Sequence, residues 1–324
     1  MILTDYLRAK KDQAWDIARM SGVKHATIRL PEDEEFDITS AVHLSDVYKR
    51  YTDFGFTPIV IEPLPNALHD HIKSGDARRD EAIESFIRSF PILDKLNLRT
   101  VCFNWMAHIG WTRTRTDHPE RGGALVTEFD LNNYEAGDAQ ITADELWANY
   151  EYFIKAVIPE AEKYGIKLAL HPDDPPIPTL GKVNRIMVTK ENIERAVFGT
   201  VKSDSLGLTM CQANFHLMGE EIPKVVNTFG KKIFFIHFRN VKGKPTHFHE
   251  TFHDNGEIDM ASALRCYTDA GIDVPIRVDH VPTMPDEVSN VPGYDAIGRF
   301  FAIGYLKGLL EATEIKGRGK NYEI

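Results

Sequence analysis

The amino-acid sequence predicts a single (β/α)8 TIM barrel, one catalytic domain over residues 1–324. The main observation is an alternation along the chain, in which apolar runs with strand character are separated mostly by segments of helical periodicity. No stretch has the composition of a linker, so one domain of this length is expected. A doubly wound sheet is the rival fold, but no glycine-rich phosphate fingerprint follows the first predicted strand.

The first third of the chain is expected to begin with a helix. Residues 4–20 have apolar side chains at helical spacing, and Ser21-Gly22 follows them as a helix end. Pro58 lies near the start of the second predicted strand, where a missing backbone donor is tolerable. The expected elements are a helix over 4–20, a strand over 23–28, a helix over 41–51, a strand over 56–62, a helix over 76–96 and a strand over 99–106.

The rest of the chain opens with its longest irregular stretch, from 111 to about 140, which is expected to be a functional or mobile loop. Thr142 to Glu145 form a capping box, so a helix is expected from there to 164, kinked or divided at Pro159. Gly165 ends it. The elements expected beyond are strands over 166–171, 206–212, 232–238, 248–252 and 275–279, and helices near 190–198, 220–229, 260–270 and 295–312.

Charge and cysteine content exclude several classes of function. A net charge of -10 gives no general electrostatic reason to bind nucleic acid or an anionic membrane. Charged residues interrupt the first twenty positions, which therefore resemble neither a signal peptide nor a membrane span, and a cytoplasmic protein is expected. Cys102, Cys211 and Cys266 are odd in number and widely spaced, so reduced thiols are expected rather than disulfides.

Four predicted strands end in a side chain that commonly binds metal ions. These residues are His171, Cys211, His237 and Asp279, and in a parallel barrel all such strand ends face one pocket. A lone strand His or Cys more often packs in a core, so the repetition is what favours a metal centre. Imidazole, thiolate and carboxylate together suit Zn²⁺, Fe²⁺ or Mn²⁺. His280 follows Asp279 and would point to the opposite face of a strand, where it could move a proton.

Cys102 and Cys266 are expected to be packing residues, because the first lies inside an apolar strand and the second in a predicted helix. Asp173 and Asp174 follow His171 and could bind a metal or start a turn before prolines, and at least one of them is expected to support a metal ligand through a hydrogen bond.

Two further groups of residues are weaker candidates. Arg113, Arg239 and Asn240 could bind a substrate carboxylate, although solvated surface positions are the commoner fate of arginine. The spacing of His249 and Glu250 is not that of a helical His-Glu-x-x-His site. They face opposite sides of their predicted strand, so a position in the core or in support of a ligand is expected about as often as direct ligation.

The chain resembles the mannonate dehydratases, whose fold is related to the xylose-isomerase-like TIM barrels. The matching motifs occur in the family's order and cover roughly residues 100–310. They are Trp111-Thr112-Arg113-Thr114, His171-Pro172-Asp173-Asp174-Pro175-Pro176, Leu208-Thr209-Met210-Cys211, His237-Phe238-Arg239-Asn240-Val241, Phe248-His249-Glu250-Thr251, Ile258-Asp259-Met260, Asp279-His280 and Pro292-Gly293-Tyr294.

The resemblance implies a hydro-lyase of carbohydrate (hexuronate) catabolism that converts D-mannonate to 2-keto-3-deoxy-D-gluconate and water. It implies that His171, Cys211, His237 and Asp279 bind the metal and that His280 and Tyr294 transfer protons. Tyr294 enters only through the resemblance, since a Tyr in Pro-Gly-Tyr is otherwise an ordinary loop aromatic. The family's metal is Mn²⁺ or Fe²⁺, whereas the thiolate alone would favour Zn²⁺. A homo-oligomer and a small anionic sugar-acid substrate are also implied.

Two stretches depart from the family's usual sequence. Gln212-Ala213-Asn214 replaces small polar residues, and Val278 and Val281 flank the Asp279-His280 pair in place of proline and glycine. The alternatives are a sugar isomerase or epimerase, or a dehydratase of another aldonic acid, on the same barrel. From a different class, a non-catalytic sugar-acid binding protein is also possible.

Overall fold

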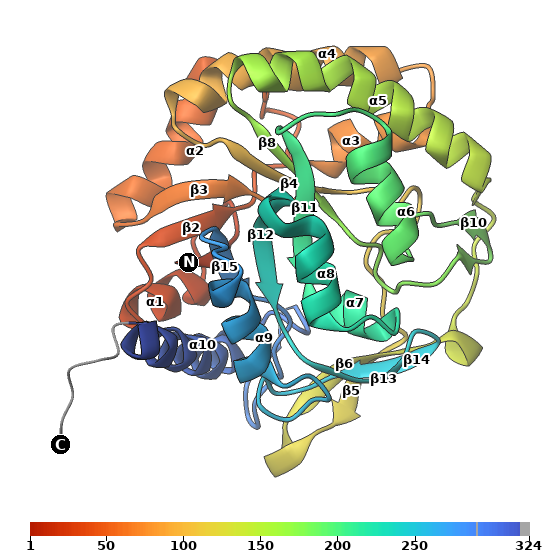
Figure 1. The fold of residues 1–324 in the computed structure, drawn as a ribbon. Helices are drawn as coiled ribbons and strands as arrows, with labels where there is room; N and C mark the ends of the chain where they lie inside the picture. Colours follow the sequence, from red (N-terminus) through yellow and green to blue (C-terminus); the bar gives the residue numbers. More distant parts are fainter. Residues whose placement is uncertain (290, 318–324) are drawn as a thin grey trace.

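The chain forms a closed barrel of parallel strands with helices around it (Figure 1). The computed structural model describes residues 1–289 and 291–317. The strands follow the cyclic order β1-β15-β12-β11-β8-β4-β3-β2, so the predicted (β/α)8 barrel is confirmed. The barrel strands are β1 (Ile2–Leu7), β2 (His25–Ile28), β3 (Thr57–Ile61), β4 (Thr100–Asn104), β8 (Lys167–His171), β11 (Leu206–Cys211), β12 (Ile233–Phe238) and β15 (Pro275–Val278).

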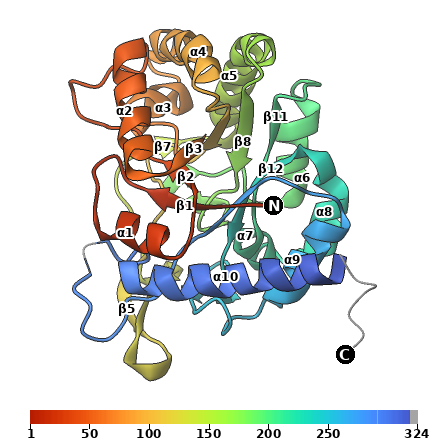
Figure 2. The same ribbon diagram turned by 90° about the vertical axis from the view of Figure 1, so that its left-hand side faces the viewer.

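Helices cover the outside of the barrel, and α10 packs along α1 and α9 (Figure 2). The helices are α1 (Gln13–Met20), α2 (Ala41–Phe54), α3 (Asn66–Ser74), α4 (Arg79–Lys95), α5 (Ala143–Lys163), α6 (Lys190–Glu194), α7 (Gln212–Leu217), α8 (Ile222–Phe229), α9 (Met260–Asp269) and α10 (Ala296–Gly317). Short helical turns are η1 (Arg121–Gly123), η2 (Leu131–Asn133), η3 (Arg195–Gly199) and η4 (Gly230–Lys232). Within residues 1–289 and 291–317, no helix combines the length and apolar character needed to cross a membrane.

The predicted capping box begins α5: the Thr142 side chain accepts the N–H of Glu145, and the Glu145 carboxylate accepts the N–H of Thr142. Pro159 lies inside α5, which continues to Lys163 rather than being divided. Helices α3 and α7 were not expected from the sequence.

The first element is a strand, so the prediction of one helix over 4–20 is wrong for its first half. The backbone of β1 pairs with both β15 and β2, and these long-range bonds outweigh the helical spacing of its apolar residues. Helix α1 starts only after Asp12, whose side chain accepts the N–H of Ala14 as an N-cap.

The prediction of a barrel strand over 248–252 is also wrong. This segment is β14 (His247–Glu250), in a four-stranded sheet of order β13-β14-β6-β5 that lies at the end toward which β12 points (Figure 1). The stretch from 111 to 140 supplies half of that sheet and is not irregular. The other three strands of the four-stranded sheet are β5 (Arg115–Pro119), β6 (Leu125–Asp130) and β13 (Val241–Lys244). A smaller sheet contains β7 (Gln140–Ile141), β9 (Thr179–Leu180) and β10 (Lys182–Asn184).

A small apolar cluster fills the inside of the barrel. Val60, Cys102, Ala169 and Phe235 pack together there, which agrees with the packing role predicted for Cys102. Because strand side chains alternate, the residue two positions later on each strand lies on the same face, one layer nearer the carboxyl end. On β3, β8 and β12 that next layer contains Glu62, His171 and His237.

Candidate metal centre and active site

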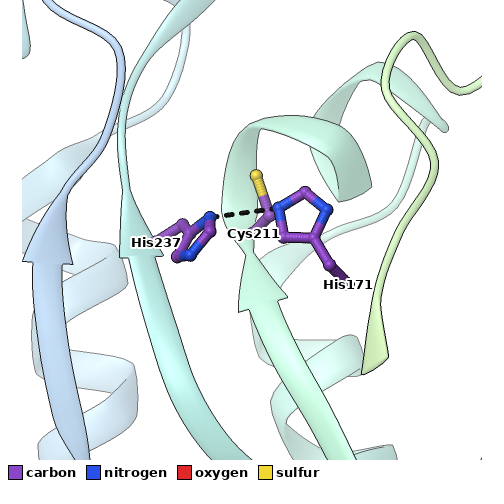
Figure 3. A group of neighbouring side chains, drawn as sticks. All are labelled: His171, Cys211 and His237. Carbon is purple, nitrogen blue, oxygen red and sulfur yellow. Dashed lines mark hydrogen bonds between the residues drawn. The ribbon is translucent and has the colours of Figure 1, made fainter. Parts of the chain in front are cut away.

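Three of the four predicted metal ligands meet at the carboxyl end of the barrel (Figure 3). His171 ends β8, Cys211 ends β11, and His237 lies one residue before the end of β12. One nitrogen or sulfur atom from each residue lies within 4.8 Å of the other two. These strands are consecutive in the barrel, and the parallel register pairs Cys211 directly with His237.

The two imidazole rings turn one nitrogen each toward the same point. His171 Nε2 lies 3.0 Å from His237 Nδ1, the contact dashed in Figure 3. Their other nitrogens face acceptors: His171 Nδ1 lies 2.6 Å from the Pro172 carbonyl oxygen, and His237 Nε2 lies 2.9 Å from Glu62 Oε1. Burial lowers the pKa of His171, against the opposing effect of Asp279, so this ring is neutral at pH 7. Rings held in this way would each aim one nitrogen at a common cation.

Asp279 lies beside this group, one residue after β15. Its Oδ2 is 3.6 Å from His237 Nδ1, while its Oδ1 accepts a hydrogen bond of 2.9 Å from Arg277. Burial by itself would raise the pKa of Asp279, but the nearby His280, Arg277 and His237 side chains outweigh burial and hold the pKa well below its usual range. The carboxylate is therefore ionised at neutral pH. Two imidazoles, a buried thiol and an ionised carboxylate suit a divalent transition-metal ion.

His280 and Tyr294 form a hydrogen-bonded pair next to the candidate metal centre. His280 Nε2 lies 3.1 Å from the Tyr294 hydroxyl, and the Trp111 ring packs 4.9 Å from the His280 ring between centroids. Burial raises the pKa of Tyr294 well above its ordinary value, so the phenol keeps its proton at neutral pH. His280 Nδ1 is 3.0 Å from Glu250 Oε1 and 2.7 Å from Arg239 Nη1. Either tautomer of His280 thus finds partners, which suits a group that gains and releases a proton.

A buried network of ion pairs supports His280 from behind. Arg113 Nη2 donates to Glu250 Oε1 at 2.6 Å and Nη1 to Asp174 Oδ1 at 2.7 Å. Arg239 donates to the same two carboxylates, at 2.6 Å to Asp174 Oδ2. Burial acts to raise the pKa of Glu250, but Arg239, His280 and Arg113 lower it to about 2. Asp174, Glu250 and His280 are close enough to share an ion, but two arginines already neutralise the carboxylates.

The remaining predicted residues differ in how closely they approach the candidate site. Arg113 and Arg239 are committed to the ion-pair network and do not line the cavity described below, so their direct contact with substrate stays a prediction. Asn240 bonds backbone groups of Val241 and Ile258. Of the three residues expected to support a ligand, Glu250 contacts His280, whereas Asp173 and His249 have other partners. Asp173 accepts the N–H of Met187, and His249 stacks on His118.

One cavity of about 520 Å³ contains the candidate site. His171, His237, Asp279, His280 and Tyr294 all line it, so the predicted metal ligands other than the fully buried Cys211 reach the same space as the proton-transfer pair. Further polar side chains line the same cavity, which are Tyr6, Arg8, Arg29, Asn66, Asp70, Lys73 and Asn104. The geometry thus brings together a divalent-cation site and a proton-transfer pair in one polar cavity.

Known proteins match this chain over nearly its whole length. The family model described as D-mannonate dehydratase (UxuA) matches residues 12–141 and 134–320. The mannonate dehydratase of Brachyspira hyodysenteriae is 32% identical to the chain, over 93% of the chain and 95% of the relative. This chain belongs to the mannonate dehydratase family. The predicted resemblance is confirmed.

Other relatives agree with the mannonate dehydratase assignment. The relative from Oceanobacillus iheyensis is 29% identical over 92% of the chain and 93% of the relative. The crystal structure of mannonate dehydratase from Streptococcus suis serotype 2 superposes with a TM-score of 0.88 at 28% identity, covering 100% of this chain and 96% of that one. A solved L-ribulose 3-epimerase has a TM-score of 0.61 at 15% identity, covers 99% of each chain, and shares the fold.

The departures from the mannonate dehydratase sequence pattern contact the ion-pair network. Asn214 Oδ1 accepts a hydrogen bond of 2.6 Å from Arg239 Nη2, and Gln212 Nε2 donates to the Arg239 carbonyl oxygen at 3.3 Å. The N–H of Val281 donates to the carbonyl oxygen of Gly293 at 2.9 Å. Asn214 and Gln212 therefore hold Arg239 in place. The hydrogen bond of Val281 connects the segment after His280 to the segment that carries Tyr294.

Three residues that contact the candidate site were assigned no role from the sequence. Glu62 contacts His237, Arg277 binds both Glu62 and Asp279, and Trp111 covers His280. Glu62 had a usable signal, because it is a carboxylate directly after an apolar strand, as Asp279 is. Arg277 reads as one polar residue inside a strand, and no local pattern distinguishes it from a solvated arginine.

Proposed function

We propose that this protein removes water from D-mannonate and gives 2-keto-3-deoxy-D-gluconate. The observation that carries the proposal is the position of the His280–Tyr294 pair, which shares one cavity with the candidate metal ligands in a member of the mannonate dehydratase family. We propose that His171, Cys211, His237 and Asp279 hold the metal, and that His280 and Tyr294 transfer the protons.

The reaction needs a base, an acid and a means of stabilising negative charge. The proton on carbon 2 is only weakly acidic, because its removal adds a second negative charge to a carboxylate that is already ionised. A bound divalent cation would supply the Lewis acid that stabilises this charge. The hydroxyl group on carbon 3 must then leave with a proton.

His280 and Tyr294 supply the two proton transfers in this proposal. Their hydrogen bond places a neutral phenol and an imidazole side by side, so one can take a proton while the other gives one. Glu250 and Arg239 fix the imidazole through its Nδ1. Trp111 covers the His280 ring, which limits the access of water to it.

The metal proposed is Mn²⁺ or Fe²⁺, with Zn²⁺ as the alternative that a thiolate ligand favours. The substrate is proposed to be a small sugar acid. A homo-oligomer and a cytoplasmic location stay predictions.

The test is a product assay with D-mannonate, on protein stripped of metal and reloaded with Mn²⁺. We expect a 2-keto-3-deoxy acid to appear with the reloaded protein and its rate to fall to background in the stripped protein. A product with the same formula as the substrate would instead identify an isomerase or epimerase. No conversion by protein with a full complement of Mn²⁺ would contradict the proposed substrate.

A further inference from the structure

The cavity has a second wall opposite the candidate metal centre. In the cyclic strand order, β3 stands opposite β12, with three strands between them on either side. Helix α3 follows β3 and contributes Asn66, Asp70 and Lys73 to the cavity, whereas His237 comes from β12. A substrate whose reacting carbons lie at the metal centre would therefore extend toward α3.

Lys73 is the most buried cation on this wall. Its side chain is 2% exposed. Its Nζ donates a hydrogen bond of 3.0 Å to the carbonyl oxygen of Met106 and lies 2.7 Å from Asp70 Oδ1. An ammonium group has three N–H donors, so these two contacts leave one donor for a ligand in the cavity. Asp70 is 57% exposed and retains acceptor capacity beside that donor. A neighbouring donor and acceptor match the hydroxyl groups of a polyol.

The position of Lys73 is fixed before any ligand binds. Asn149 of α5 donates 3.0 Å to the Lys73 carbonyl oxygen. One turn earlier in α3, the buried His69 ring packs 5.5 Å from Trp105 and 5.9 Å from Phe153 between ring centroids. A donor held in place loses little conformational entropy when it binds a substrate, so its hydrogen bond contributes more to affinity.

We propose that Lys73, together with Asp70, binds the hydroxyl groups at the end of the sugar acid remote from its carboxylate, and so selects six-carbon over shorter aldonic acids. This inference rests on the proposed function, because that function places carbons 2 and 3 at the metal centre and leaves carbons 4 to 6 to reach α3. The polar side chain of Asn66, also on α3 and also lining the cavity, agrees with a hydroxylated ligand.

The experiment compares two substrates that differ only in the remote end. L-Erythronate has the configuration of D-mannonate at carbons 2 and 3 and lacks carbons 5 and 6. Dissociation constants of both acids are measured by calorimetry on Mn²⁺-loaded protein, with kcat/KM alongside. We expect Lys73→Met to weaken D-mannonate binding about 10- to 100-fold, the range for a lost hydrogen bond to a charged group, and L-erythronate binding by less than about 3-fold.

Lys232→Met is the matched control. Lys232 Nζ also contacts a backbone carbonyl, that of Ser203, and an aspartate, Asp204, but it lies just before β12 at the other end of the barrel. We expect this variant to bind both acids as the wild type does. If Lys73→Met fails to fold, Asp70→Asn serves instead, since Asp70 is exposed. We expect it to weaken D-mannonate binding about 3- to 10-fold and to spare L-erythronate.

Equal weakening of both acids would place the effect at the carboxylate end and overturn the inference, as would no weakening of either. If D-mannonate binds with the predicted dependence on Lys73 but is not converted, the proposed reaction fails and this inference stands. If D-mannonate is converted but neither its binding nor its conversion depends on Lys73, the proposed reaction stands and this inference fails. Failure of D-mannonate to bind at all would contradict both.

Discussion

Glu62 connects two proposed metal ligands that lie on neighbouring strands. Its carboxylate lies 2.9 Å from His237 Nε2 and accepts two hydrogen bonds of 2.7 Å from Arg277, which in turn bonds Asp279. Groups that orient ligands in this way typically change metal affinity 10- to 100-fold when removed. We therefore expect Glu62→Gln to weaken Mn²⁺ binding by about that factor, measured by titration calorimetry.

Asp5→Asn is the control for Glu62→Gln. Asp5 forms a similarly buried pair with Arg299 but touches no proposed ligand. This variant should lose stability and keep its Mn²⁺ affinity. Equal Mn²⁺ affinity in Glu62→Gln and the wild type would show that the series of contacts from His237 through Glu62 and Arg277 to Asp279 does not position the ligands.

A substitution at His280 tests proton transfer separately from metal binding. Its side chain contacts Tyr294 and Glu250 and lines the cavity, but it does not belong to the group of His171, Cys211 and His237. His280→Asn should therefore keep the full Mn²⁺ content and lose turnover by at least about 100-fold. Metal analysis and a rate assay on the same sample check this. Loss of the metal would place His280 among the ligands.

At the scale of elements, α10 packs directly on the segment that follows His280. A Cβ atom at Gly298 would lie 2.0 Å from the Pro282 carbonyl oxygen. Gly298→Ala must push α10 and this segment apart, so we expect a loss of about 1–3 kcal/mol in the free energy of unfolding. Because the segment also positions His280, kcat should fall together with stability.

Gly304→Ala, on the same helix, is the control for Gly298→Ala, because a Cβ there meets no atom within 4 Å. Its helix propensity should raise stability by up to about 1 kcal/mol with kcat unchanged. Urea unfolding and steady-state rates distinguish the two variants. A Gly298→Ala protein as stable and active as the wild type would contradict the described packing.

The elements also show what local sequence determines. Helices with a strong cap or apolar face, such as α5 and α9, were predicted nearly to the residue. The β1 strand was missed because its backbone pairs with β15 near the other end of the chain, a partner that no local pattern reveals. The β14 strand was correct as a strand but assigned to the wrong sheet, because alternation does not identify the neighbouring strand.

The positions of the candidate site residues were predicted better than the identity of the eight barrel strands. Its residues lie at strand ends, and that position depends on parallel strand direction rather than on which strands are adjacent. Two errors, the missed β1 and the surplus β14, cancelled in the total of eight. The structure shows that His171, Cys211, His237 and Asp279 lie at the ends of four consecutive strands, β8, β11, β12 and β15.

For the whole molecule, the buried carboxylates predict sensitivity to acid. Neighbouring arginines, against the opposing effect of burial, lower the pKa of Glu250 from an ordinary 4.5 to about 2. A carboxyl with a lowered pKa stabilises the fold above its unfolded pKa, and this contribution is lost as the pH falls toward its folded pKa. The free energy of unfolding should therefore decrease from about pH 4.5 to about pH 2. Glu62 and Asp174 have pKa values lowered by the same kind of neighbour and act in the same direction.

Urea unfolding of metal-free protein at a series of pH values measures this effect. Glu250→Gln should be about 3–5 kcal/mol less stable at pH 7, because the charges of Arg113 and Arg239 lose a buried partner. It should also lose less stability than the wild type between pH 4.5 and 2. An identical pH dependence in both proteins would refute the assignment to Glu250.

In the proposed site, four consecutive strands hold one divalent cation beside His280. Anomalous X-ray diffraction from crystals of the Mn²⁺-loaded protein tests it most directly. We predict one strong peak within about 2.5 Å of a nitrogen, sulfur or oxygen atom from each of His171, Cys211, His237 and Asp279. A peak that lies instead among Asp174, Glu250 and His280, or that lacks Cys211 or Asp279 as a ligand, would contradict it.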